Sequence, residues 1–133
     1  MQHTRHFTLE EASGLLPWLR SQLGQLEAAK LELARLQQRR ETLFREVRTN
    51  GHGEAGRGVS DARQAVDLAA ERLTRLAQEV ADRGILLRDT ERGLVDFPAL
   101  RDGREVYLCW LLGEDDIRFW HDVDAGFAGR KLL

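Results

Sequence analysis

The hydrophobic residues of this chain change their spacing once, near Gly84, and this change restricts the fold more than any other feature of the sequence. Before it, leucines and alanines recur every three or four residues, the spacing that places them on one face of an α-helix. After it, apolar and polar residues alternate, which is typical of β-strands. The sequence therefore predicts an α+β protein: a long antiparallel helical hairpin over residues 8–83, then a small antiparallel β-meander of three or four strands with a C-terminal tail over residues 84–133.

The helical half contains signals for a start, a break and a tip. Thr8 is a suitable N-cap, and Glu11 stands three residues later, where its carboxylate completes a capping box. Pro17 has no amide hydrogen, so we expect it to bend the first helix or to separate a short first turn from the rest. The glycine-rich residues 50–59 predict a flexible tip loop.

A second helix is predicted from Ser60, a suitable N-cap, to Gly84, a residue type that commonly ends helices. Two long helices joined by a short loop run antiparallel, because only then do their apolar stripes bury each other. Leaving the proline aside, residues 9–49 would form a helix of about 60 Å at 1.5 Å per residue, which is too long for a compact domain of this size. We therefore expect apolar surface that another copy of the chain covers, most simply in a homodimer.

Four segments with alternating residues are expected to be strands, namely residues 85–89, 94–100, 104–112 and 117–122. The sequence Asp102-Gly103 is a strong signal for a two-residue hairpin turn, which pairs Val95 with Trp110. A four-residue loop over residues 113–116 would then pair Leu112 with Ile117 and Leu108 with His121.

These two turns predict one apolar and one mixed face of the sheet. The apolar face, with His121 at its edge, consists of Val95, Phe97, Ala99, Val106, Leu108, Trp110, Leu112, Ile117 and Phe119. The other face includes Asp96, Tyr107, Cys109, Arg118, Trp120 and Asp122. The helical hairpin or a second subunit must cover the apolar face.

Composition narrows the classes of function. A chain of 133 residues with 42% hydrophobic residues fits one domain over residues 1–133. Its net charge of −2 disfavours general attraction to nucleic acid, and the arginines late in the first helix alternate with glutamates, as on an ordinary solvated face. No signal peptide and no apolar run of ~20 residues are present, so we expect a cytoplasmic protein without membrane contact. The single cysteine excludes an intrachain disulfide and a four-cysteine zinc site.

Several stretches resemble one family along nearly the whole chain. They are FTLEEA and LPWL near the start, then GILLRD, GLVDFP, REVYLCW, FWH and GFAGR. Together these stretches resemble the short bacterial proteins called domain of unknown function 2203 (DUF2203). The resemblance implies no activity, cofactor or catalytic residue.

A cluster near the C-terminus offers ligands for a metal ion. His121, Asp122 and Asp124 supply nitrogen and oxygen atoms, with Glu114 expected nearby across the hairpin, a set that suits zinc or manganese. Their spacing matches no strong metal motif, and a histidine beside a core more often bonds a carbonyl or a carboxylate. We therefore expect no cofactor, and keep a divalent ion at His121, Asp124 and Glu114 as the alternative.

Cys109 is the one candidate nucleophile. A cysteine between Leu108 and Trp110 in a strand is usually a small buried apolar residue. A reactive thiolate needs a nearby cation or helix N-terminus, whereas the predicted register places Asp96 and Trp120 beside it. Because a carboxylate raises the pKa of a thiol, we do not expect catalysis by Cys109.

Two classes of function remain. The preferred hypothesis is a non-enzymatic, self-associating interaction or scaffold protein that contacts an unidentified protein through Trp110, Trp120, Asp96 and Arg130. The alternative is a small metal-binding protein or enzyme with a site around Glu114, His121, Asp124 and Arg130. The first requires Trp110 or Trp120 on an exposed or subunit-covered patch, and the second requires a pocket that His121 shares with a carboxylate.

Overall fold

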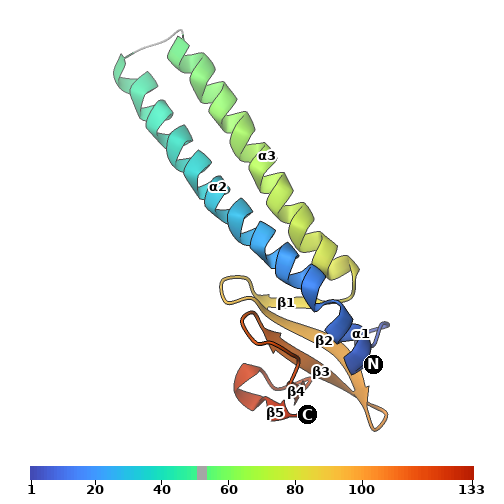
Figure 1. Cartoon of the computed structure of the whole chain (residues 1–133). Coiled ribbons are helices and arrows are strands. Elements are labelled where there is room, and N and C mark those ends of the chain that lie inside the picture. Colours follow the sequence, from blue (N-terminus) through green and yellow to red (C-terminus); the bar gives the residue numbers. More distant parts are fainter. Residues whose placement is uncertain (51–53) are drawn as a thin grey trace. The chain divides into compact units, whose positions relative to one another are not determined.

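The computed structural model describes residues 1–50 and 54–133 (Figure 1). Its helices are α1 (Leu9–Gly14), α2 (Leu16–Asn50), α3 (Glu54–Asp82) and the short 3-10 helix η1 (Phe127–Gly129). Its strands are β1 (Leu86–Asp89), β2 (Leu94–Arg101), β3 (Arg104–Leu111), β4 (Phe119–Asp122) and β5 (Lys131–Leu132). The predicted α+β class is confirmed. The chain forms two compact units, the sheet unit (residues 1–24 and 77–133) and the hairpin unit (residues 25–76).

The first helix begins where the capping signals predict. Thr8 Oγ1 accepts a hydrogen bond from the Glu11 amide at 3.0 Å, and the Thr8 amide donates to Glu11 Oε1 at 2.9 Å. Pro17 is the second residue of α2. Amide groups in the first turn of a helix have no acceptor within the helix, so a proline without an amide hydrogen is tolerated there. The proline therefore stands at the separation of α1 from α2, one of the two outcomes that the sequence predicts.

The start of α3 differs from the prediction. The helix begins at Glu54, so Ser60 lies inside it and the predicted N-cap is wrong. Val59 is half-buried, and a Cβ atom added at Gly58 would lie 3.9 Å from Leu43 Cδ2 of α2. Packing against α2 thus continues before Ser60 and favours helix there despite the glycines. Of the tip loop predicted over residues 50–59, residues 51–53 lie outside the described residues.

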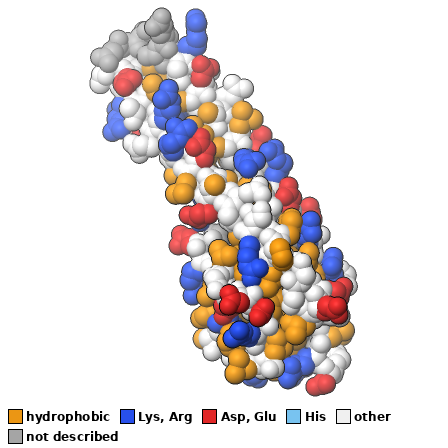
Figure 2. Space-filling model, in the orientation of Figure 1, with side chains coloured by type: hydrophobic (Ala, Val, Ile, Leu, Met, Phe, Trp, Pro, Cys, Tyr) orange, Lys and Arg blue, Asp and Glu red, His pale blue; other side chains and the backbone are white. Residues whose placement is uncertain are grey.

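In the hairpin unit, α2 and α3 run antiparallel, side by side (Figure 1). Its buried apolar side chains are Leu26, Ala29, Ala62, Val66 and Leu76. Among the described residues of this unit, large apolar side chains that are exposed include Leu31 (64%), Leu68 (58%) and Phe44 (44%). Positive and negative side chains are interspersed on the face that Figure 2 shows. No helix among the described residues combines the length and hydrophobicity that crossing a bilayer requires.

The sheet is an antiparallel meander in the order β1-β2-β3-β4-β5. The β2–β3 hairpin has the predicted register, with Val95 opposite Trp110. Its turn consists of Asp102 and Gly103, whose φ angles of +52° and +76° explain why this residue pair is favoured there.

The register of β3 with β4 was predicted wrongly by one residue. Leu108 lies opposite Trp120 and Tyr107 opposite His121, whereas the prediction paired Leu108 with His121. The connection covers residues 112–118 instead of the predicted four, because Glu114 binds back to β3. Its carboxylate accepts from the Leu111 amide at 2.8 Å. Since side chains alternate along a strand, the shift moves every β4 side chain to the opposite face.

The sheet also has one strand more than the three or four predicted. β5 pairs with β4, with Phe119 opposite Leu132 and Trp120 opposite Lys131. The sequence predicts a C-terminal tail there and no strand, because two paired residues are too few to show an alternation.

Two faces of the sheet result, and both are largely buried. The inner face carries Val95, Phe97, Ala99, Val106, Leu108, Trp110 and Trp120, all buried. Phe7, just before α1, packs edge-on against Phe97 at 5.3 Å between ring centroids, and Arg20 of α2 lies over the Trp110 ring. The polar face carries Asp96, Tyr107, Cys109 and His121, which are also buried.

Candidate functional site

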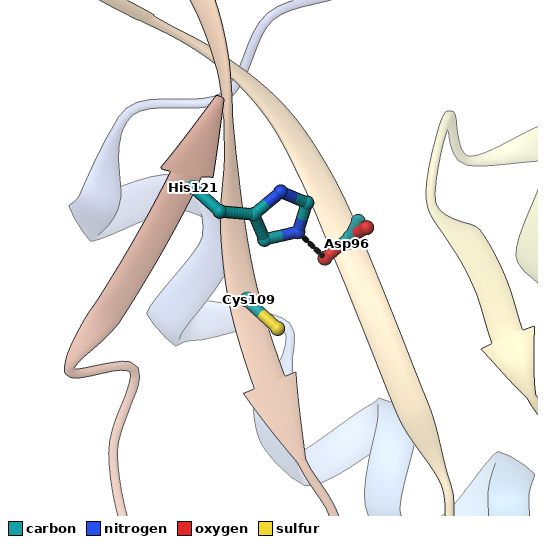
Figure 3. Close-up of side chains that lie close together, drawn as sticks. All are labelled: Asp96, Cys109 and His121. Atoms are coloured by element: carbon teal, nitrogen blue, oxygen red, sulfur yellow. Dashed lines mark hydrogen bonds and ion pairs between the residues drawn. The ribbon is translucent and has the colours of Figure 1, made fainter. Parts of the chain in front are cut away.

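Three neighbouring strands bring Asp96, Cys109 and His121 together on the polar face of the sheet (Figure 3). Asp96 of β2 lies opposite Cys109 of β3, and His121 of β4 lies opposite Tyr107, two residues from Cys109. Each of the three is at most 3% exposed. One ligand atom from each lies within 4.8 Å of the other two. The arrangement is therefore a buried cluster of oxygen, sulfur and nitrogen.

The hydrogen bonds of His121 fix how its ring presents its nitrogens. Nδ1 lies 2.8 Å from the carbonyl oxygen of Asp122, which only accepts, so Nδ1 carries hydrogen and donates. Nε2 lies 2.9 Å from Asp96 Oδ1 and thus points into the cluster. A neutral imidazole has one N–H, so this second contact needs a further proton, on the ring or the carboxyl, or a metal ion in its place.

Arg88 borders the cluster from β1. It is the extra residue of a β-bulge between Leu87 and Asp89, and its Nε donates to Asp96 Oδ2 at 3.0 Å. Its guanidinium also lies over the Tyr107 ring, 5.0 Å from the centroid. The side chain remains 44% exposed, so it reaches from solvent to the buried carboxylate.

The thiol of Cys109 is held in its protonated form. Burial, and after it the charge and hydrogen bonding of Asp96, raise the pKa of Cys109 to about 12, while Arg130 acts in the opposite direction. The predicted neighbour Asp96 is confirmed, but the other neighbour is Phe119 and not Trp120. Both His121 nitrogens face oxygen atoms of Asp96 and Asp122, so neither is placed to take the thiol proton. The geometry argues against a cysteine nucleophile.

A pocket of about 280 Å³ adjoins the cluster. Asp96, His121 and Arg88 contribute its polar wall. The rest of its lining is formed by Leu94, Val123, Ala125, Gly126 and Phe127. His121 and a carboxylate thus share one empty volume.

The N-terminal residues cover another part of the polar face. His3 Nε2 lies 2.7 Å from the Tyr107 hydroxyl, and the amides of Gln2 and His3 donate to the Glu105 carboxylate at 2.9 and 3.2 Å. His6 Nε2 lies 2.7 Å from Glu105 Oε2. The His6 bond first, and then the two amides, lower the pKa of Glu105 to about 2. The carboxylate therefore anchors this segment to β3.

The residues predicted around a metal site lie in different places. Arg130 Nη1 donates to both carboxylate oxygens of Glu114 at 3.1 Å, and Arg130 also lies over the Phe119 ring. Asp124 is exposed, and His121 is hydrogen-bonded to Asp96 instead of to either of these acids. The structure thus pairs Glu114 with Arg130 and His121 with Asp96, and Arg130 also reaches the Cys109 thiol beside Asp96.

The predicted partner-binding tryptophans are inside the sheet unit. Trp110 is completely buried, with Nε1 donating to the Glu114 carbonyl at 3.0 Å, and Trp120 is 7% exposed. Asp96 is buried as well, and the Arg130 side chain is 13% exposed. Two features distinguish the hypotheses. Neither Trp110 nor Trp120 is exposed among the described residues, whereas the pocket that His121 shares with a carboxylate is present.

Asp96 and Cys109 were missed as partners of His121 for one reason. The sequence placed Asp96 opposite Cys109, but the assumed four-residue loop put His121 on the other face. Two neighbouring aromatic residues, Phe119 and Trp120, fit either register, so hydrophobicity alone left the choice open. The size of Trp120 was the available signal. Burying tryptophan on the apolar inner face removes more apolar surface from water than burying the smaller Phe119 there, and so stabilises the fold more.

Comparison with known proteins confirms the resemblance noted in the sequence. A family model described as an uncharacterized conserved protein, DUF2203, matches residues 5–133. No curated protein and no solved structure matches the chain.

Proposed function

We propose that this chain, which belongs to the uncharacterised DUF2203 family, is a metal-binding protein that holds a divalent transition-metal ion through Asp96, Cys109 and His121. The observation that carries the proposal is the ligand cluster itself: three donor atoms, buried on three adjacent strands, within 4.8 Å of one another. Rigid strands position such ligands more exactly than loops do.

The orientation of His121 supports the proposal. Histidines that bind metals usually donate their other ring N–H to a carbonyl or carboxylate, which fixes the tautomer. His121 makes this contact through Nδ1 with the Asp122 carbonyl, and directs Nε2 at Asp96, with the Cys109 thiol in the same cluster.

The donor set favours zinc among the divalent ions. Sulfur and imidazole are good ligands for zinc, whereas magnesium and calcium take oxygen. Zinc bonds of about 2.0–2.3 Å place the ligand atoms of one ion roughly 3–4 Å apart, so Asp96, Cys109 and His121 need to move only slightly to share one. Three protein ligands leave a fourth position for water or another small ligand.

Metal content tests the proposal directly. We expect protein purified without chelator, then saturated with zinc and desalted, to retain about one ion per chain. Asp96→Asn and His121→Gln should each abolish this retention. Asp124→Asn is the matched control, because Asp124 is an exposed acid of the same region, and it should retain the ion. Circular dichroism verifies that each variant is folded. Zinc-free wild-type protein, or loss of zinc in Asp124→Asn alone, would refute the proposal.

We also propose self-association of the hairpin unit, most simply into a homodimer of a cytoplasmic interaction protein. Its support is the exposure of Leu31, Phe44 and Leu68, large apolar side chains that a second copy would cover. Sedimentation equilibrium over a range of concentrations tests this, with Leu31→Lys and Leu68→Lys expected to give monomers. A wild-type protein that stays monomeric throughout that range would exclude it.

A further inference from the structure

We infer that the pocket beside Asp96 and His121 binds a small monocarboxylate with an apolar body, held jointly by the metal ion and Arg88. The inference rests on the proposed metal site and goes beyond it by assigning the class of ligand. It draws on the charges around the cluster, the N–H donors of Arg88 and the lining of the pocket.

The charge balance at the loaded site favours an anion. Asp96 and Cys109 contribute at most two negative charges, which a divalent ion neutralises. Arg88, whose charge Asp96 otherwise balances, then leaves the site with a net charge of at least plus one. Arg88 lines the pocket, so one negative charge bound there restores the charge balance of the site.

Arg88 has the donors to complete this interaction. Its Nε is bonded to Asp96, and its two terminal nitrogens carry four further N–H groups, of which Tyr107 engages only part. Planar guanidinium groups bind carboxylates through paired hydrogen bonds. The Tyr107 ring beneath Arg88 limits the positions of the guanidinium, so fewer conformations are lost on binding.

The lining of the pocket selects a carboxylate with an apolar body over phosphate. Leu94, Val123, Ala125 and Phe127 surround the space beyond the polar wall. At about 280 Å³ the pocket is at the lower end of the range for ligand sites, so it suits a molecule of a few carbon atoms. Phosphate would place charged oxygens against these apolar side chains without compensating donors.

Titration calorimetry with butyrate tests the inference in protein whose zinc content is measured in the same sample. We expect butyrate to bind the zinc-loaded protein at least about tenfold more tightly than the metal-free protein, and more tightly than butyramide or inorganic phosphate. Equal binding of butyrate and butyramide, or equal binding of phosphate, would overturn the assigned ligand class. A protein that holds zinc but binds no butyrate overturns this inference alone, whereas absence of zinc overturns the metal site as well.

Substitution of Arg88 separates its contribution from that of the metal. Arg88→Gln should retain zinc at saturation and lose about tenfold in butyrate affinity, and Arg88→Lys should lose less because it keeps the charge. Arg118→Gln is the matched control, since Arg118 is an arginine of the same unit whose side chain is 65% exposed and lies outside the pocket lining. Unchanged butyrate affinity in folded, zinc-loaded Arg88→Gln would refute the role of Arg88.

Discussion

On the inner face of the sheet, Phe97 and Trp110 are buried among apolar side chains, whereas on the polar face Asp96 and His121 are buried among hydrogen-bond partners. The first kind of burial releases water from apolar surface and stabilises the fold. The second kind of burial removes water from polar groups. Their hydrogen bonds in the protein mainly compensate for this loss, so the net contribution to stability is small. The inner face of the sheet thus stabilises the fold, and the other face keeps buried polar and ionisable groups.

The largest expected difference between the faces is in stability. Phe97→Ala should lower the free energy of unfolding by about 3–5 kcal/mol, because it leaves a cavity in the inner face. Leu100→Ala, in the same strand but 50% exposed, should change it by no more than about 0.5 kcal/mol. Urea denaturation of the metal-free protein measures both. Equal effects of the two substitutions would contradict the assigned role of the inner face.

Substitutions on the polar face should have the opposite pattern, with a large effect on zinc affinity and a small effect on the free energy of unfolding. Cys109→Ala should weaken zinc binding by at least about a hundredfold, since a direct ligand matters no less than the groups that orient it. It should change the free energy of unfolding of metal-free protein by only about 1 kcal/mol. Competition with a chromophoric chelator and urea denaturation give the two values. Zinc affinity that survives the substitution would remove Cys109 from the site.

Acid should weaken metal binding. With the pKa of Cys109 near 12, the thiol is protonated throughout the neutral range, so coordination as thiolate releases a proton. That proton alone makes zinc affinity rise about tenfold for each pH unit from 6 to 8 and fall equally as pH decreases. Chelator competition at three pH values gives the slope, and residual binding in Cys109→Ala should depend less on pH. A slope that Cys109→Ala leaves unchanged would argue against thiolate coordination.

The smallest effect concerns the N-terminal segment that covers part of the polar face. Glu105 has a pKa of about 2 in the fold against an ordinary 4.5, so its contribution to stability is present above pH 4.5 and is lost as pH falls towards 2. Glu105→Gln should therefore be less stable than wild type at pH 6, with the difference shrinking below pH 4.5. Urea denaturation across this range measures it, and the exposed Glu91→Gln is the control. A difference independent of pH would mean that the carboxylate charge does not anchor the segment.

The elements that the sequence predicts well have strong local signals. The capping box at Thr8 and the Asp102-Gly103 turn depend on neighbouring residues, and both are found as expected. The turn also placed Asp96 opposite Cys109, so two members of the cluster were paired correctly.

The elements predicted wrongly depend on contacts between distant residues. Glu114 bonds back to the Leu111 amide and lengthens the loop, which no turn signal indicates. The resulting shift moved His121 from one face to the other, and the candidate site changed with it. The early start of α3 likewise reflects its close approach to α2, where a Cβ atom added at Gly58 would lie 3.9 Å from Leu43 Cδ2.

Asp96, Cys109 and His121 belong to three successive strands, and β4 contributes only four residues to the ladder. An ion shared by all three would cross-link β4, which pairs with β3 over only four residues, to β2 and β3. By mass action, a free concentration of a hundred times the dissociation constant adds about 2.7 kcal/mol to the folded state. The free concentration of the metal would then determine how stably β4 remains paired in the sheet.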